Sequence, residues 1–190
     1  MGQKDLKILK TVFGFDEYLA GQERIIAEIL SGEDVLTIMP TGGGKSLCYQ
    51  LPALMFKGMT VVVSPLIALM QSQVAQLQLL GIKAASLNSS NTFQENRNTL
   101  NMLDTNELKM LYAAPERLVK QETIELLKNK NISLLAIDEA HCISQWGHDF
   151  RKEYLELGHL RKELSMVQTI GLTATADRAT RKAMIEKIFQ

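Results

Sequence analysis

The stretch that decides the fold is Pro40-Thr41-Gly42-Gly43-Gly44-Lys45-Ser46, a glycine-rich loop. The apolar residues 35–39 before it predict a strand, and residues 45–56 after it predict a helix. Such a loop directs backbone N–H groups at phosphate oxygens, and the positive end of the following helix adds to the attraction. Lys45 would reach the β- and γ-phosphates of a nucleotide, and the Ser46 hydroxyl would bind Mg²⁺.

The loop departs from the strict phosphate-loop pattern at one position. That pattern has a glycine six residues before the lysine, where this chain has Met39. One alternative is a glycine-rich turn that binds nothing. The preceding strand, together with Lys45 and Ser46, favours a variant loop that binds a nucleoside triphosphate.

Short apolar runs alternate with helical stretches along the whole chain, which indicates a parallel sheet covered by helices on both faces. We therefore expect one α/β domain over residues 1–190, a doubly wound, mostly parallel sheet of the P-loop NTPase type. Its ligands should lie beyond the carboxyl ends of the strands. The expected strands are 35–39, 60–64, 84–87, 109–113, 133–137 and 167–172; the expected helices are 22–30, 45–56, 67–79, 92–103, 122–128, 154–164 and 178–188.

Composition excludes several classes of protein. The 21 basic and 21 acidic side chains balance, so the net charge does not indicate a nucleic-acid partner. Only a local group of suitable residues could indicate one. Cys48 and Cys142 form no CxxC pair, so neither a disulfide framework nor a zinc site is expected in this segment. Residues 59–70 form the most apolar stretch, which is shorter than the roughly 20 residues of a membrane-spanning helix. We expect a cytoplasmic protein without a membrane partner.

A second motif is acidic: Asp138-Glu139-Ala140-His141 follows the apolar run Leu134-Leu135-Ala136-Ile137. A carboxylate at the end of a buried strand beside a phosphate loop is well placed to bind Mg²⁺, and the next carboxylate can orient an attacking water. We assign the metal role to Asp138 and the water role to Glu139. Asp-Glu after a strand is common by itself, but together with the loop it predicts hydrolysis of ATP. The catalytic residues are thus expected to be Lys45, Asp138 and Glu139.

Seven segments together resemble the RecQ family of superfamily 2 helicases, and they cover nearly the whole chain. The run that follows His141 is the most discriminating of them. The segments are 13–22, 39–50, 63–70, 114–118, 138–141, 142–151 and 172–176. The resemblance implies an ATP-dependent 3′ to 5′ DNA helicase acting in replication, recombination and repair, whose partners are single-stranded and partly duplex DNA.

Two residues upstream of the loop are candidates for binding the base. Gln22 offers a donor and an acceptor to an adenine edge, which would favour ATP over GTP. Phe15 could stack on the base, although it could equally be a core aromatic. The nucleotide-binding set is therefore Phe15, Gln22, Thr41, Gly42, Gly43, Gly44, Lys45 and Ser46, with Mg²⁺ on Ser46 and Asp138.

The candidate DNA-binding residues lie after other strands. Ser64 suits a phosphate of a single strand. Trp146, His148, Phe150 and Arg151 combine aromatic rings with a cation, as in sites that stack unpaired bases, although the two aromatic rings could also be buried. The resemblance identifies this segment as the loop that couples single-stranded DNA to ATP turnover. It also implies that Thr173 and Thr175 connect the carboxylates to the DNA side by hydroxyl hydrogen bonds.

Three positions depart from the family pattern. Leu19 stands where an arginine is usual near the adenine, Ala20 replaces a proline, and Lys152 replaces another proline. We expect Leu19 to weaken nucleotide binding. None of the three substitutions removes a group needed for hydrolysis.

The resemblance covers only the first of the family's two RecA-like lobes. The second lobe, which supplies an arginine finger, and the zinc and winged-helix modules have no counterpart in these residues. We therefore expect weak ATP binding, very slow hydrolysis and no unwinding by the 190-residue chain. Two alternatives remain open at this point: an RNA helicase lobe of the same superfamily, and a non-catalytic ATP-dependent switch or docking module.

Overall fold

A computed structural model describes residues 3–144 and 149–190. At its centre is a six-stranded sheet in the order β1-β6-β5-β2-β4-β3, and every pair of neighbouring strands is parallel. The sheet confirms the predicted doubly wound α/β fold. Its strands are β1 (Val35–Ile38), β2 (Met59–Val63), β3 (Ala84–Leu87), β4 (Met110–Ala113), β5 (Ile132–Ile137) and β6 (Thr169–Thr173).

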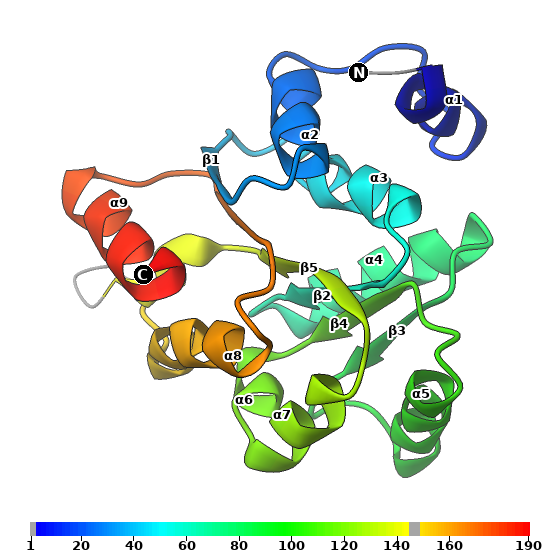
Figure 1. The fold of residues 1–190 in the computed structure, drawn as a ribbon, viewed down its shortest axis with the longest axis vertical. Helices are drawn as coiled ribbons and strands as arrows, with labels where there is room; N and C mark the ends of the chain where they lie inside the picture. The colour runs from blue at the N-terminus through cyan, green and yellow to red at the C-terminus, as the bar shows by residue number, and fades with distance from the viewer. Residues whose placement is uncertain (1–2, 145–148) are drawn as a thin grey trace.

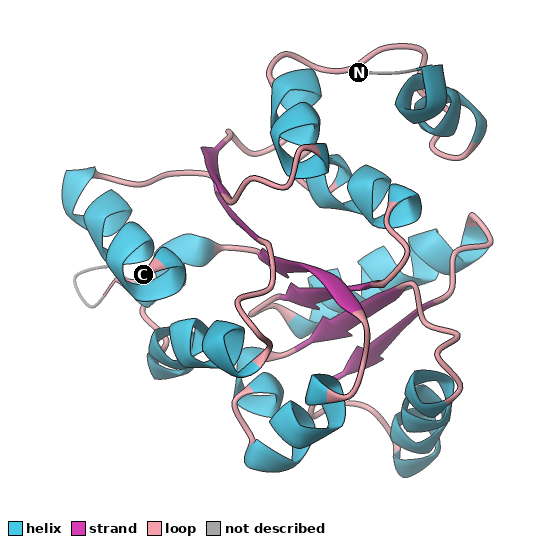
Figure 2. Cartoon of the chain, in the orientation of Figure 1, coloured by secondary structure: helices cyan, strands magenta, loops and turns pink. Residues whose placement is uncertain are grey.

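Helices cover both faces of the sheet (Figures 1 and 2). The apolar clusters place α2 (Gln22–Leu30), α3 (Leu47–Met55) and α4 (Ile67–Leu79) on one face. The opposite face is covered by α5 (Phe93–Asp104), α6 (Pro115–Leu118), α7 (Gln121–Lys128), α8 (Leu157–Glu163) and α9 (Arg178–Met184). Two 3₁₀ helices, η1 (Ala140–Ile143) and η2 (Lys152–Glu156), precede α8, and a π-helical turn, η3 (Ile185–Phe189), follows α9.

The apolar runs in the sequence are explained by burial on both faces. Along β2, Val61 and Val63 pack into the cluster under α5 to α9, while Val62 packs into the cluster under α2 to α4. All three side chains are fully buried. Successive side chains of a strand point to opposite faces, so a strand covered on both sides needs a continuous apolar run.

Most predicted elements are confirmed, some with shifted ends. The predicted bounds of α2 and α4 match the structure, and the Thr92–Glu95 pair forms the expected capping box before α5. The helix predicted from residue 45 begins at Leu47, because Lys45 and Ser46 belong to the turn that ends the loop. The helix predicted over 154–164 is divided between η2 and α8.

Two of the described α-helices were not predicted, and neither was the 3₁₀ helix η1. The first, α1 (Gln3–Thr11), packs against α2 and α3 through Leu9, which is fully buried. The other is the single turn α6, which begins at Pro115. In the part of the chain that the structure describes, no helix is long and apolar enough to cross a lipid bilayer.

Candidate active site

The strand order gathers the candidate residues at one edge of the sheet. Strands β1, β6, β5 and β2 are consecutive neighbours and parallel, so their carboxyl ends lie side by side. The segments that follow them carry the glycine-rich loop after β1, Thr175 after β6, Asp138 after β5 and Ser64 after β2. This edge is where ligands bind in open α/β sheets.

The glycine-rich loop depends on backbone conformations that favour glycine. Gly42 and Gly44 have φ angles of 82° and 72°, in the left-handed region. The Gly43 N–H donates to the Pro40 carbonyl at 3.0 Å, which closes a tight turn. Lys45 Nζ donates to the Met39 carbonyl at 3.4 Å, so the ammonium folds back over the loop. Thr41 is exposed on the same loop.

Gln22, the first residue of α2, holds this loop by hydrogen bonds of its side chain, a contact called here the Gln22 clamp. Its Oε1 accepts a hydrogen bond from the Leu19 N–H at 2.8 Å, and its Nε2 donates to the Gly44 carbonyl at 3.0 Å. The side chain is 2% exposed. Its donor and its acceptor both have protein partners here, so an adenine edge would have to share or replace these bonds.

Two hollows border the loop. One, of about 520 Å³, is lined by Phe15, Leu19, Gln22, Gly44 and Ser46, together with residues of α4. Phe15 is 53% exposed, so it is available for stacking and is not a core aromatic. This volume lies in the range of small-molecule sites.

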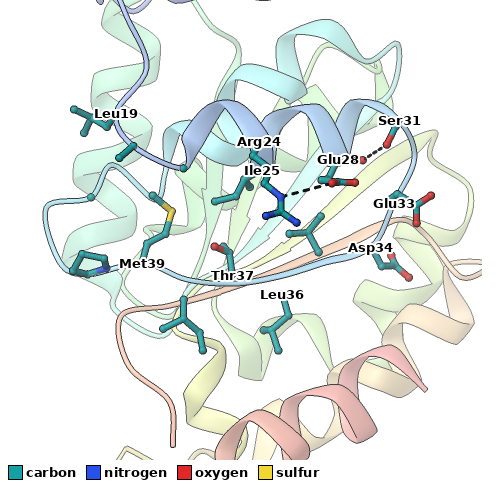
Figure 3. Close-up of a pocket in the computed structure, with 16 residues that line it drawn as sticks. Leu19, Arg24, Ile25, Glu28, Ser31, Glu33, Asp34, Leu36, Thr37 and Met39 are labelled. Carbon is teal, nitrogen blue, oxygen red and sulfur yellow. Dashed lines mark hydrogen bonds and ion pairs between the residues drawn. The ribbon is translucent and has the colours of Figure 1, made fainter. Parts of the chain in front are cut away.

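The other hollow, of about 900 Å³, lies between α2 and the free edge of β1 (Figure 3). It carries Arg24, Glu28, Glu33 and Asp34, and Arg24 and Glu28 form an ion pair at 4.0 Å. Its acidic side chains make it a poor site for phosphates, because they would repel an anion. The hollow beside Phe15 and Ser46 is therefore the better candidate for a nucleotide site.

The acidic motif follows β5 directly. The pKa of Asp138 is raised to about 6, first by burial and then by the negative charge of Glu139; the Glu139 N–H and the charges of Lys45 and His141 act in the opposite direction. The Asp138 Oδ1 accepts this N–H at 3.0 Å, and Glu139 itself has a φ of 49°. The left-handed conformation at Glu139 is a local strain of the kind found at functional sites.

His141 connects the acidic motif to β6. Its Nδ1 lies 2.8 Å from Thr173 Oγ1 and 3.2 Å from Glu139 Oε2, and its Nε2 lies 3.6 Å from Asp149 Oδ2. Thr173 Oγ1 donates to the Thr175 carbonyl at 3.0 Å. The contacts of Thr175 in this group are made by its backbone, so the described geometry places the hydroxyl connection at Thr173.

The structure describes some of the candidate DNA-binding residues but not all of them. Ser64 is 2% exposed, and its hydroxyl has no hydrogen-bond partner among the described residues. Phe150 is 37% exposed and is therefore not a core residue, and the Arg151 N–H donates to the Cys142 carbonyl at 2.9 Å. Trp146 and His148 lie outside the described residues.

Three contacts at the site were not predicted from the sequence. Tyr154 OH donates to the Asp138 carbonyl at 2.8 Å, which holds the strand end from η2. Gln73 donates to Ser46 Oγ at 3.2 Å, and Gln50 donates to Gln73 Oε1 at 2.6 Å. The partners are up to 27 positions apart in sequence, and no local motif signals such pairing.

The donors at this edge fit Mg²⁺. Asp138 is a partly buried carboxylate whose pKa is raised first by burial and then by the negative charge of Glu139, so a cation would stabilise its charged form. Ser46 adds a neutral oxygen. Magnesium in nucleotide sites is held by one or two such oxygens together with phosphates and waters. The described residues contain no group of three or more His, Cys, Asp or Glu that could hold a metal ion.

A phosphate loop after one strand and an acidic pair after a nearby strand define a nucleotide-binding P-loop domain of the RecA-like kind. Residues 20–183 match the model of the DEAD/DEAH box helicase family, and the chain belongs to this family. The ATP-dependent DNA helicase RecQ of Haemophilus influenzae is 48% identical over 183 residues, 96% of this chain and 30% of that protein. RecQ of Pasteurella multocida is 50% identical over 186 residues, 98% of this chain and 29% of that protein. The expected resemblance to RecQ is confirmed, and the chain spans about 30% of the length of these relatives.

Solved structures confirm the fold. The helicase MrfA bound to DNA superimposes with a TM-score of 0.77 at 18% identity, covering 100% of this chain and 28% of that one. The DEAD-box helicase Mss116 bound to ssRNA and UDP-BeF gives a TM-score of 0.76 at 21% identity, covering 99% of this chain and 41% of that one.

Proposed function

We propose that this chain is the ATP-binding first motor lobe of a RecQ-like DNA helicase. The parent protein would couple ATP hydrolysis to 3′ to 5′ movement along single-stranded DNA and to duplex unwinding in replication, recombination and repair. The observation that carries the proposal is the position of Asp138 and Glu139 at the same sheet edge as the loop that holds Lys45. Relatives named as ATP-dependent DNA helicases match nearly the whole chain, which supports it.

Each residue at the edge has a defined task in this proposal. Lys45 would leave the Met39 carbonyl and bind the terminal phosphates. Mg²⁺ held by Ser46 and Asp138 would neutralise charge on the phosphates. Glu139 would accept a hydrogen bond from the attacking water and orient it. Phe15 and Gln22 would bind the adenine in the 520 Å³ hollow.

The DNA side would begin at Ser64, whose buried hydroxyl and neighbouring N–H groups suit a backbone phosphate. Phe150 and Arg151, with Trp146 and His148, would stack bases and pair with phosphates. The His141–Thr173 contact would transmit occupancy of this side to Glu139. A backbone-tracking site of this kind does not itself distinguish DNA from RNA, so the experiment has to compare them.

In this proposal the described residues hold only one half of the catalytic site. A second RecA-like lobe of the parent would close the cleft and supply an arginine, which is worth about 10³- to 10⁵-fold in rate in related phosphoryl-transfer sites. The isolated chain should therefore bind ATP weakly, hydrolyse it very slowly and leave duplexes intact. Strand separation by the 190-residue chain alone would refute the one-lobe proposal.

The decisive experiment measures steady-state ATP turnover by the parent protein with single-stranded DNA, with single-stranded RNA and without nucleic acid. We expect strong stimulation by DNA only, loss of nucleotide binding in Lys45→Ala, and retained binding with lost turnover in Glu139→Gln. Equal stimulation by RNA would favour an RNA helicase. Unchanged turnover in Glu139→Gln would favour a nucleotide-dependent switch.

A further inference from the structure

A glutamine on α4 contacts the hydroxyl that ends the phosphate loop. Gln73 Nε2 donates to Ser46 Oγ at 3.2 Å, across 27 positions of sequence. Both residues line the 520 Å³ hollow beside the loop. Ser46 is the residue before α3, so the contact joins the start of α3 to the middle of α4.

A chain of hydrogen bonds sets the orientation of the Gln73 amide. Gln50 Nε2 donates to Gln73 Oε1 at 2.6 Å and to the Tyr112 hydroxyl at 3.1 Å. The Tyr112 hydroxyl in turn donates to Tyr49 OH at 3.4 Å. Because the Gln73 oxygen is taken by Gln50, its NH₂ group is the one that faces Ser46.

This orientation determines what the Ser46 hydroxyl can do. An NH₂ group only donates, so Gln73 occupies one of the two lone pairs of Ser46 Oγ. The second lone pair stays available for a cation, and the O–H bond has to point elsewhere. Without such a partner, a serine hydroxyl rotates among several hydrogen-bonding orientations. A ligand that needs one of these orientations then has to offset the conformational entropy lost when the hydroxyl is fixed.

We propose that Gln73 is a positioning residue that fixes the Ser46 hydroxyl for the metal-bound nucleotide. The inference rests on the proposed function, because it requires Ser46 to meet the metal. Gln73 itself contacts neither the nucleotide nor the metal in this proposal. It acts through Ser46, and Gln50 and Tyr112 hold it in place.

The contact also gives α4 a direct connection to the nucleotide. Helix α4 begins at Ile67, three residues after Ser64, whose buried hydroxyl has no partner among the described residues. Any displacement of α4 relative to α3 would therefore change the contact between Gln73 and Ser46. This path is separate from the His141–Thr173 contact, which runs through β6.

The test measures nucleotide binding rather than turnover. The affinity of the chain for a fluorescent, non-hydrolysable ATP analogue is determined with excess Mg²⁺ and again with EDTA, and the ratio gives the gain from the metal. The variant is Gln73→Met, which keeps the length and apolar contacts of the side chain but removes the donor. The matched control is Gln71→Met, because Gln71 lies on the same helix but bonds Ser90 at 3.0 Å and does not reach the loop.

We expect Gln73→Met to lower the gain from Mg²⁺ by roughly 3- to 10-fold, as for one hydrogen bond, with the EDTA affinity unchanged. Gln71→Met should match the wild type. Gln50→Met should act in the same direction more weakly, and it serves as the second variant if Gln73→Met lowers the melting temperature strongly. An unchanged gain in folded Gln73→Met, or an equal loss in Gln71→Met, overturns the positioning role. Failure of the underlying proposal is distinct: Lys45→Ala would then bind the analogue as the wild type does.

Discussion

His141 Nδ1 lies 2.8 Å from Thr173 Oγ1, although 32 positions separate the two residues in sequence. The Thr173 hydroxyl donates its own proton to the Thr175 carbonyl, so it accepts from His141, and Nδ1 carries the proton. The same Nδ1 lies 3.2 Å from Glu139 Oε2. One imidazole N–H therefore joins the end of β6 to the glutamate proposed to orient water.

Thr173→Val tests this connection, because valine has the shape of threonine without its hydroxyl. Thr173 is fully buried, so the change leaves the Thr175 carbonyl without its partner and should lower the free energy of unfolding by about 1–2 kcal/mol. In the parent protein, stimulation of ATP turnover by single-stranded DNA should fall more than basal turnover. Urea unfolding and ATPase assays measure the two effects.

Thr60→Val is the matched control for this prediction. Thr60 is also a fully buried strand threonine, but its hydroxyl has no hydrogen-bond partner among the described residues. Valine at this position should leave stability unchanged or raise it, because it removes an unpaired buried polar group. Equal destabilisation by both substitutions would show that the loss comes from packing and not from the His141 connection.

Asp138→Asn should stabilise the metal-free chain at neutral pH. The pKa of Asp138 is about 6 in the folded chain, above its ordinary value of 3.8. The folded state therefore binds a proton more tightly, and stability falls as pH rises through about 4 to 6. The variant should gain on the order of 2 kcal/mol at pH 7 and little at pH 4. Urea unfolding in EDTA at both pH values measures this difference.

Asp16→Asn is the opposite case on the surface. A hydrogen bond from Lys10, and then its positive charge, lower the pKa of Asp16, so this carboxylate stabilises the fold at neutral pH and loses that contribution as pH falls. The effect is small because the pair is exposed.

For Asp138→Asn, a gain in stability of equal size at pH 4 and pH 7 would contradict burial of the Asp138 charge as the cause of that gain.

Gly44→Ala and Gly42→Ala separate two reasons for glycine in the loop. Both residues have a positive φ, so alanine is strained by about 1 kcal/mol at either position. A Cβ at Gly44 would also collide with Gln22 Nε2, whereas a Cβ at Gly42 would meet nothing within 4 Å. Gly44→Ala should therefore weaken nucleotide binding roughly 3- to 10-fold more than Gly42→Ala, as for the loss of one hydrogen bond, and titration with an ATP analogue would measure this. Equal losses would mean that the Gln22 clamp does not matter for binding.

Local patterns predicted the parts of the fold that local physics determines. Residues close in sequence determine three of these parts: the glycine-rich loop, the capping box at Thr92 and the apolar run of β2. The site edge was predictable for the same reason, because parallel strands place their carboxyl ends together. Helix α1 was missed because its sequence, Gln3–Thr11, is mostly polar, and Leu9 is its one fully buried hydrophobic residue among those described.

Contacts between distant segments could not be predicted in this way. Gln73 is one of several glutamines on α4, and only the packing of α4 beside α3 identifies it as the partner of Ser46. The same holds for the Tyr154 hydroxyl on the Asp138 carbonyl. Such pairs depend on side-chain direction in three dimensions, which the spacing of residues along the chain does not encode.

Arg161 provides a final prediction about the end of the chain. It is 5% exposed, donates to the carbonyls of Val167 at 3.1 Å and Phe189 at 3.2 Å, and forms an ion pair with Asp34. Arg161→Met keeps the stem but leaves these acceptors unpaired, so stability should fall by about 3 kcal/mol. Amide hydrogen exchange should rise most in η3, because its last carbonyl loses its partner.

The control for this change is Arg24→Met. Arg24 pairs with Glu28 at 4.0 Å on the surface, with 87% of its side chain exposed. Loss of such a pair should cost less than about 1 kcal/mol. A small effect of Arg161→Met, similar to that of Arg24→Met, would mean that burial of Met184 and Ile188 holds the last helix without the arginine. A large effect confined to Arg161 would show that one buried guanidinium joins the residue before β1 to the last turn of the chain.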